Sequence, residues 1–234
     1  MKKIIVFMLA LALCLASFTS CKFFNKVTNK FKSPLEDVQT MYNSSAPTRI
    51  VATTKQVFQS YELNSKYEII LGQVDGMDAS VYNVTEEKLE SLESAGGTEV
   101  VKPLIKTVTT KTESIAGIGS RTDGGPWNPE GGATVIGRGS MAINLDKDRV
   151  TDVNYQDHVL TFTIPNANID AVLGGAFSSG IAGDVKVTIV DDGAVVTSIE
   201  LHYTLLGNDK AGLPQSEMIV KVEYTYDLEQ ITIS

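Results

Sequence analysis

The sequence is poor in the residues from which recognisable catalytic and metal sites are usually built. Its 234 residues include two cysteines, two histidines and one tryptophan. It contains no G-x-S-x-G or H-E-x-x-H motif and no pair of histidines at ligand spacing. His158 and His202 are therefore expected to have structural or solvent-exposed roles. We predict a protein that is not an enzyme and that holds no metal or cofactor.

A cluster of acids does not change the expectation for metals. Asp146, Asp148 and Asp152 are spaced like the ligands of a calcium loop. An EF-hand loop, however, needs an oxygen ligand where Val150 stands and a glycine where Thr151 stands. The stretch is predicted to be a solvated turn.

The chain also lacks an excess of basic residues. It has 20 Lys and Arg against 28 Asp and Glu, a formal net charge of −8. An acidic surface repels the phosphate backbone, so nucleic acid is not an expected partner.

Only the N-terminus carries a long hydrophobic run. Two lysines after Met1 are followed by an uncharged stretch, residues 4–16, which has the layout of a secretory signal and is too short for a comfortable membrane span. The stretch "FTSC", ending at Cys21, resembles the bacterial lipobox. That resemblance implies cleavage after residues 1–20 and attachment of a diacylglycerol to the Cys21 thiol. The alternative is a plain cleaved signal with an unmodified Cys21.

Residues 21–32 form a basic tether after the predicted cleavage site. Lys22, Lys26 and Lys30 are four residues apart, and an amphipathic helix here would lie on an anionic leaflet. A disordered spacer is the other interpretation. The membrane, reached through acylated Cys21, is thus the expected partner, and the expected location is extracytoplasmic, at a cell membrane or outer membrane.

Residues 33–234 are predicted to form a single β-rich domain. A capping box at Ser33 begins one helix, a second is expected from Thr85 to Gly96, and a third, short one begins at Asn168. Strands are predicted wherever apolar residues alternate with polar ones; these stretches are 48–58, 61–74, 99–112, 141–145, 153–155, 160–164, 185–189, 195–205 and 218–228. The expected fold class is α+β, with a large curved antiparallel sheet, half-barrel-like, and about three short helices packed on it.

A glycine-rich stretch interrupts these strands. Residues 117–140 are expected to form a mobile connection, with Trp127 near the centre. The indole would either pack down on the sheet as a plug or project as a contact for a ligand or partner. Trp127 is therefore a candidate ligand or lid contact.

With its lipobox, N-terminal helix and long antiparallel strands, the chain resembles in architecture the half-barrel lipoproteins of the LolA and LolB type and of the LppX and LprG type. These are associated with lipid or lipoprotein transport. The resemblance implies a carrier that binds an apolar or lipid-like ligand in the concave side of the sheet. The alternative is an interaction or adaptor domain of the cell envelope that has no ligand cavity.

Overall fold

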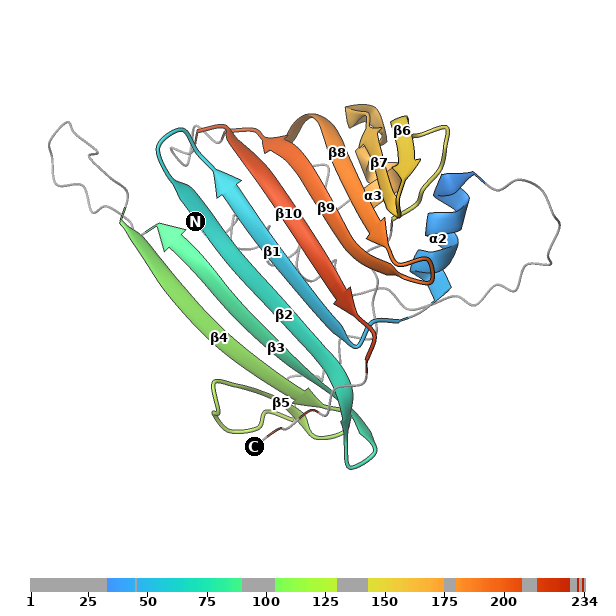
Figure 1. Ribbon diagram of the computed structural model, residues 1–234. Coiled ribbons are helices and arrows are strands. Elements are labelled where there is room, and N and C mark those ends of the chain that lie inside the picture. Colours follow the sequence, from blue (N-terminus) through green and yellow to red (C-terminus); the bar gives the residue numbers. More distant parts are fainter. Residues whose placement is uncertain are drawn as a thin grey trace, which may run out of the picture.

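Ten antiparallel strands form one open, curved sheet in the computed structural model (Figure 1). The structure describes residues 33–44, 46–89, 104–129, 143–174, 180–207, 214–227, 231 and 233. The strands are β1 (Arg49–Val57), β2 (Glu62–Val74), β3 (Met77–Leu89), β4 (Ile105–Ile115), β5 (Gly119–Thr122), β6 (Thr151–Gln156), β7 (Val159–Ile164), β8 (Ile181–Asp191), β9 (Val196–Leu205) and β10 (Ser216–Thr225). The helices in these ranges are α2 (Pro34–Ser44) and the short α3 (Ile169–Leu173), which follows the 3-10 turn η1 (Asn166–Asn168).

The strand order shows how the sheet is built. It reads β5-β4-β3-β2-β1-β10-β9-β8-β7-β6, so each half is a simple up-and-down meander. The halves join where β1 pairs with β10 in an unbroken register from Arg49↔Thr225 to Val57↔Glu217. Two-residue turns with positive φ at both positions connect β2 to β3, at Asp75-Gly76, and β6 to β7, at Asp157-His158. Such turns match the twist of antiparallel strands.

Helix α2 begins where the sequence predicts it. The Ser33 hydroxyl accepts the backbone N–H of Glu36 at 3.3 Å, and proline occupies the first helical position, where no N–H is needed. Leu35, Val38 and Tyr42 then lie on one buried face. The Tyr42 ring meets the Tyr224 ring of β10 edge-on, with centroids 6.3 Å apart.

The prediction of a helix from Thr85 to Gly96 is wrong for residues 85–89, which the structure describes, because β3 continues to Leu89. Thr85 and the glutamates that follow it resemble the first turn of a helix. In the structure they belong to a strand with a neighbour on each side, and Thr85 pairs with Lys66 of β2 and with Thr109 of β4. Hydrogen bonds to two neighbouring strands outweigh the local helix signal. The described chain thus has two short helices rather than about three.

The other expectations are met in part. The short helix predicted at Asn168 is present as α3. Ile143 and Leu145, expected on a strand, lie in an irregular segment but are buried. The N–H of Asn144 donates to the Val172 carbonyl, and the N–H of Leu145 donates to the Gln39 side chain, so this segment connects the two helices.

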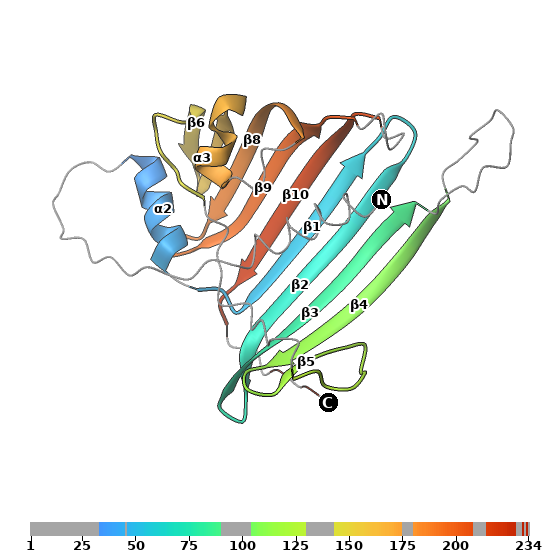
Figure 2. The same ribbon diagram turned by 180° about the vertical axis from the view of Figure 1, so that it is seen from behind.

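The core lies on one face of the sheet, which we call the helix-side face. It is formed by side chains of β1–β3, β7–β10, α2, α3 and the segment 143–150. Figure 2 shows α2 and α3 over the β6–β9 end of this face, whereas no described helix lies in front of β1–β4. The opposite side, which we call the open face, carries alternating threonines, lysines and acids. No helix in the described ranges is long and apolar enough to span a bilayer.

Candidate functional site

The helix-side face continues beyond the helices as an apolar surface over β1, β2 and β3. The cross-strand register places Ile50 opposite Ile69, and Tyr67 opposite Val84. All four side chains are buried, as is Leu71. β-Branched and aromatic residues suit such paired positions. The surface is apolar at this end of the strands.

The same face becomes polar toward the other end of these strands. The Tyr67 hydroxyl donates to Glu86 Oε1 at 2.9 Å, and Lys88 Nζ lies 2.9 Å from Glu86 Oε2. Ser65, which pairs with Glu86 across β2 and β3, lies two residues from Tyr67 on the same face of β2. Tyr82 lies on the same face of β3. We call these five residues the Tyr67–Glu86 cluster.

Burial sets the chemistry of the two phenols in the cluster. Burial, and then the nearby charge of Glu86, raises the pKa of Tyr82 to about 12. The pKa of Tyr67 is raised well above its ordinary value by burial first and by Glu86 second. Both phenols therefore stay protonated at physiological pH, and that of Tyr67 donates to Glu86.

Two buried hydroxyls on β1–β3 have no hydrogen-bond partner among the residues that the structure describes. They belong to Tyr82 and to Thr54 of β1. By contrast, the neighbouring Gln56 amide donates to the Ser216 hydroxyl at 2.9 Å. An unsatisfied buried hydroxyl costs about 1–3 kcal/mol. Polar atoms that lack a protein partner are candidates to contact a ligand.

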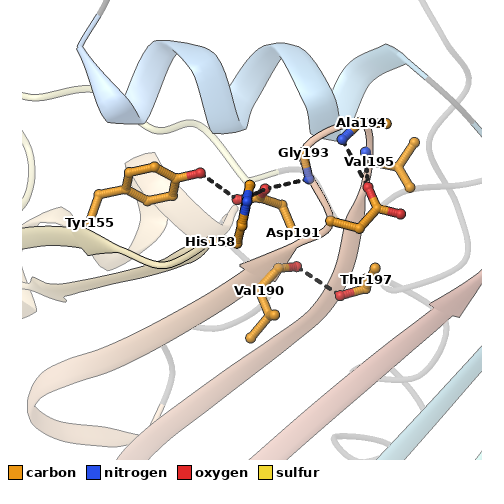
Figure 3. Close-up of polar contacts among 9 residues, drawn as sticks. Tyr155, His158, Val190, Asp191, Gly193, Ala194, Val195 and Thr197 are labelled. Atoms are coloured by element: carbon orange, nitrogen blue, oxygen red, sulfur yellow. Dashed lines mark hydrogen bonds and ion pairs between the residues drawn. The ribbon is translucent and has the colours of Figure 1, made fainter.

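A second polar network lies at the opposite end of the sheet and is drawn in Figure 3. The carboxylate of Asp191, which is completely enclosed, accepts hydrogen bonds from the Tyr155 hydroxyl at 3.0 Å and from the Gly193 N–H at 2.8 Å. His158 Nδ1 lies 2.8 Å from the same carboxylate. The Asp191 N–H donates to the His158 carbonyl as well. One carboxylate thus holds together the β6–β7 and β8–β9 turns.

A carboxylate that contacts an imidazole, as Asp191 contacts His158, also occurs in nucleophilic triads. A triad also needs a hydroxyl or thiol on the second ring nitrogen. In the ranges that the structure describes, no hydroxyl or thiol hydrogen-bonds that nitrogen of His158. His158 is exposed in its turn, with φ 65°, and the network acts as a structural brace.

The residues singled out from the sequence fall in different places. Cys21 and the tether lie outside the described residues. Trp127 is half-buried beside the edge strand β5, where the Arg121 guanidinium lies 4.9 Å above its ring. His202 is exposed on β9. The structure does not bring Trp127 into the Tyr67–Glu86 cluster, because Arg121 pairs with Glu113 on the open face.

The acids of the expected turn also stay apart from the cluster. The Asp148 N–H donates to Asp146 Oδ1 at 3.0 Å, a turn contact. Across the described ranges, no three His, Cys, Asp or Glu side chains are grouped closely enough to hold a metal ion.

Sequence reasoning missed the Tyr67–Glu86 cluster because Glu86 was assigned to a helix. The signal that would have found it is the alternation of Tyr82, Val84 and Glu86. This alternation places a carboxylate on the apolar face of a strand.

No family model matches this chain, and no curated protein matches it in sequence. Among solved structures it is similar to Rv2717c from M. tuberculosis, at 10% identity over 82% of this chain and 98% of that chain, with a TM-score of 0.28. A TM-score this low carries no conclusion about fold or function. What this chain binds must therefore be argued from its own residues.

Proposed function

We propose that this chain is a non-enzymatic, extracytoplasmic lipoprotein that binds an amphiphilic, lipid-like ligand. Acylated Cys21 would hold it at a cell membrane or outer membrane, as its lipobox-like stretch suggests. An open curved sheet with helices on one face is also the arrangement implied by the resemblance to half-barrel lipoproteins. The binding surface is the helix-side face of β1–β3.

One observation carries the proposal. An apolar surface of Ile50, Ile69 and Val84 meets the Tyr67–Glu86 cluster on one face of β1–β3. Two buried hydroxyls on these strands have no partner in the described chain: that of Tyr82, opposite Ile69, and that of Thr54, opposite Ser65. An amphiphile has the same division, with a chain that needs apolar contact and a head group that needs hydrogen bonds. The acyl chain would lie along the aliphatic residues, and the head group would reach the cluster.

The carboxylate of Glu86 limits which kinds of head group the cluster can bind. Glu86 is an acceptor that already holds Tyr67 and Lys88. A neutral, hydroxyl-bearing head group can donate to the carboxylate and accept from Tyr82, whereas an anionic head group is repelled by it. We therefore expect a neutral amphiphile to bind more tightly than the corresponding fatty acid.

The test compares a monoacylglycerol with its free fatty acid, both carrying the same fluorescent acyl chain. The protein carries Cys21→Ala so that it can be handled without detergent. We expect saturable binding and a preference of about tenfold for the monoacylglycerol, the equivalent of about 1.4 kcal/mol. Glu86→Gln should narrow that preference. Glu87→Gln is the matched control, because the next residue points to the open face and accepts from Asn64.

If the folded protein takes up neither probe, the amphiphile proposal is wrong, and the envelope interaction domain becomes the better account. The anchor is tested separately. Cys21→Ala should move the protein from the membrane fraction to the soluble fraction, and a variant that stays in membranes after a salt wash would contradict lipid attachment.

A further inference from the structure

A hollow on the open face lies outside the site proposed for the amphiphile. Its volume is about 380 Å³, and its lining includes Thr53, Lys55, Lys66, Thr85 and Lys221. It spans β10, β1, β2 and β3 near the middle of the sheet, where the strands of the two meanders join (Figure 1).

The register places three lysines around one threonine. Thr53 of β1 pairs with Lys221 of β10 on one side and with Lys66 of β2 on the other. Lys55 is two residues further along β1, so its side chain lies on the same face. Neighbouring strands are about 4.8 Å apart and alternate residues about 6.7 Å apart, so all three ammonium groups can reach the space above the Thr53 hydroxyl.

The ion pairs around the hollow leave its lysines available. Lys55 lies 2.9 Å from Glu62, and Lys221 lies 2.7 Å from Glu223, but all four side chains are well exposed. Such pairs contribute at most about 1 kcal/mol each, so an incoming anion can compete with them. Lys66 has no ion pair among the residues that the structure describes.

The acid that lines the hollow is already engaged. Glu87 Oε2 accepts both the backbone N–H of Asn64, at 2.8 Å, and its side-chain amide, at 3.0 Å. The hydroxyls of Thr53 and Thr85 lie in one cross-strand row with Lys66 between them. The hollow thus combines three cationic donors with two hydroxyls, a set that suits an oxyanion with several acceptor atoms.

We propose that this hollow binds a phosphate group, either free or carried on a lipid head group. A volume of about 380 Å³ exceeds what a phosphate alone would fill, since one water takes about 30 Å³ of liquid volume. The remaining room admits a small polar extension such as a glycerol. The lysines of this site and Thr53 point to the face of the strands opposite Tyr67 and Glu86, so the two ligands would use different side chains. Thr54 and Ser65 also border the hollow.

The experiment uses the full chain carrying Cys21→Ala, with inorganic phosphate and glycerol phosphate as probes in titration calorimetry at low salt. Lys66→Gln should weaken binding about tenfold, the loss expected for one charge-assisted hydrogen bond. Thr53→Val, which keeps the shape and suits a strand, should weaken it less. Lys186→Gln is the control, because Lys186 is an exposed lysine of the same face on β8, in register with His202 and outside the hollow.

A second arm distinguishes the source of the phosphate. The same variants are sedimented with vesicles of phosphatidylglycerol or of phosphatidylcholine. If the group is carried on a lipid, Lys66→Gln should reduce binding to phosphatidylglycerol vesicles and Lys186→Gln should not. If only the soluble probes show the Lys66 dependence, the ligand is a free phosphate compound.

The proposal is overturned if the folded chain binds neither probe nor anionic vesicles. It is also overturned if Lys186→Gln weakens binding as much as Lys66→Gln, because the effect would then come from the charge of the whole face. Thermal unfolding of each variant confirms that the sheet is intact. Amphiphile uptake by Lys66→Gln should be unchanged, which separates this proposal from the function proposed above.

Discussion

In the half of the sheet made by β6–β10, the side chains that face α2 and α3 are mostly aliphatic, with a few aromatic rings, and are almost completely enclosed. The half made by β1–β5 also buries hydroxyls, an amide and two carboxylates. Leu160, Ile189 and Leu201 are typical of the first half. Among the described residues that are buried and polar, only Asp191 and Ser216 lie outside the range 48–114.

This difference indicates that the two halves of the sheet have different roles, one in stability and one in binding. Burying aliphatic side chains under two helices contributes about 25 cal/mol per Å² of apolar surface, so the β6–β10 half carries much of the stability. Buried polar groups contribute little net stability and are costly when unpaired. The β1–β5 half therefore keeps its polar groups at a cost that a binding role would explain.

The largest expected effect comes from a core leucine under the helices. Leu160→Ala should lower the free energy of unfolding by about 3 kcal/mol, because Leu160 is fully enclosed and its removal leaves a cavity. Leu63→Ala is the counterpart on β2, where the side chain is only half-buried, and should cost about 1 kcal/mol. Urea titrations of both variants measure the difference. Equal losses would contradict the contrast between the halves.

The second largest loss of stability is expected for Asp191, the buried carboxylate of the β6–β10 half. Asp191→Asn places an amide donor where the carboxylate now accepts from Tyr155, His158 and Gly193, and should cost about 2 kcal/mol. Asp157→Asn, in the same pair of turns but exposed, should stay within about 0.5 kcal/mol. Thermal unfolding compares them. If the two substitutions cost the same, the brace has no structural role.

The third effect depends on pH and concerns a buried carboxylate of the other half. Burial alone would raise the pKa of Glu113, but the ion pair with Lys111 and the hydrogen bond from Arg121 outweigh it, and the pKa lies below its ordinary value. A depressed pKa in the folded state gives stability that is present above the unfolded pKa and is lost as the pH falls through the folded pKa.

Unfolding titrations between pH 7 and pH 3 test this dependence. Glu113→Gln should cost about 1–2 kcal/mol at pH 7 and should flatten the loss of stability below about pH 4.5. Glu62→Gln, which removes the exposed partner of Lys55, should change the profile less. A Glu113→Gln profile that is parallel to the wild type would show that the carboxylate does not contribute.

The smallest effect is expected at the hydroxyl that has no partner. Tyr82→Phe should not lower the free energy of unfolding and should raise it by up to about 1 kcal/mol, because it removes a buried hydroxyl that has no hydrogen-bond partner within the described chain. Tyr67→Phe removes the donor to Glu86 and should cost about 1 kcal/mol. Denaturant unfolding of the two variants measures the comparison. A clear loss for Tyr82→Phe would mean that its hydroxyl is already satisfied.

The sequence predicts those elements whose signals are local. The capping box at Ser33 gives the start of α2, and the alternating stretches 185–189 and 195–205 fall within β8 and at β9. Alternating apolar residues likewise locate β1, β2, β7 and β10. In each case the side chains that fix the structure are close together along the chain.

What the sequence could not give depends on partners that are distant along the chain. Residues 85–89 are a good helix start in isolation and become a strand only because β2 and β4 flank them. The Tyr67–Glu86 cluster follows from that register, so misreading the strand also hid the site. The hollow around Thr53 could not be predicted from the sequence either, since it forms only when β10 lies beside β1.

The pairing of β1 with β10 has a consequence for how the protein matures. These strands come from the two ends of the domain, so their contacts have nearly the largest sequence separation that the chain allows, and such topologies fold slowly. Until β10 has emerged, β1 presents an unpaired edge that can join the wrong strand. A chain that crosses a membrane N-terminus first would expose that edge throughout its passage. Premature termination anywhere before Ser216 should therefore give an aggregating product rather than a smaller folded one.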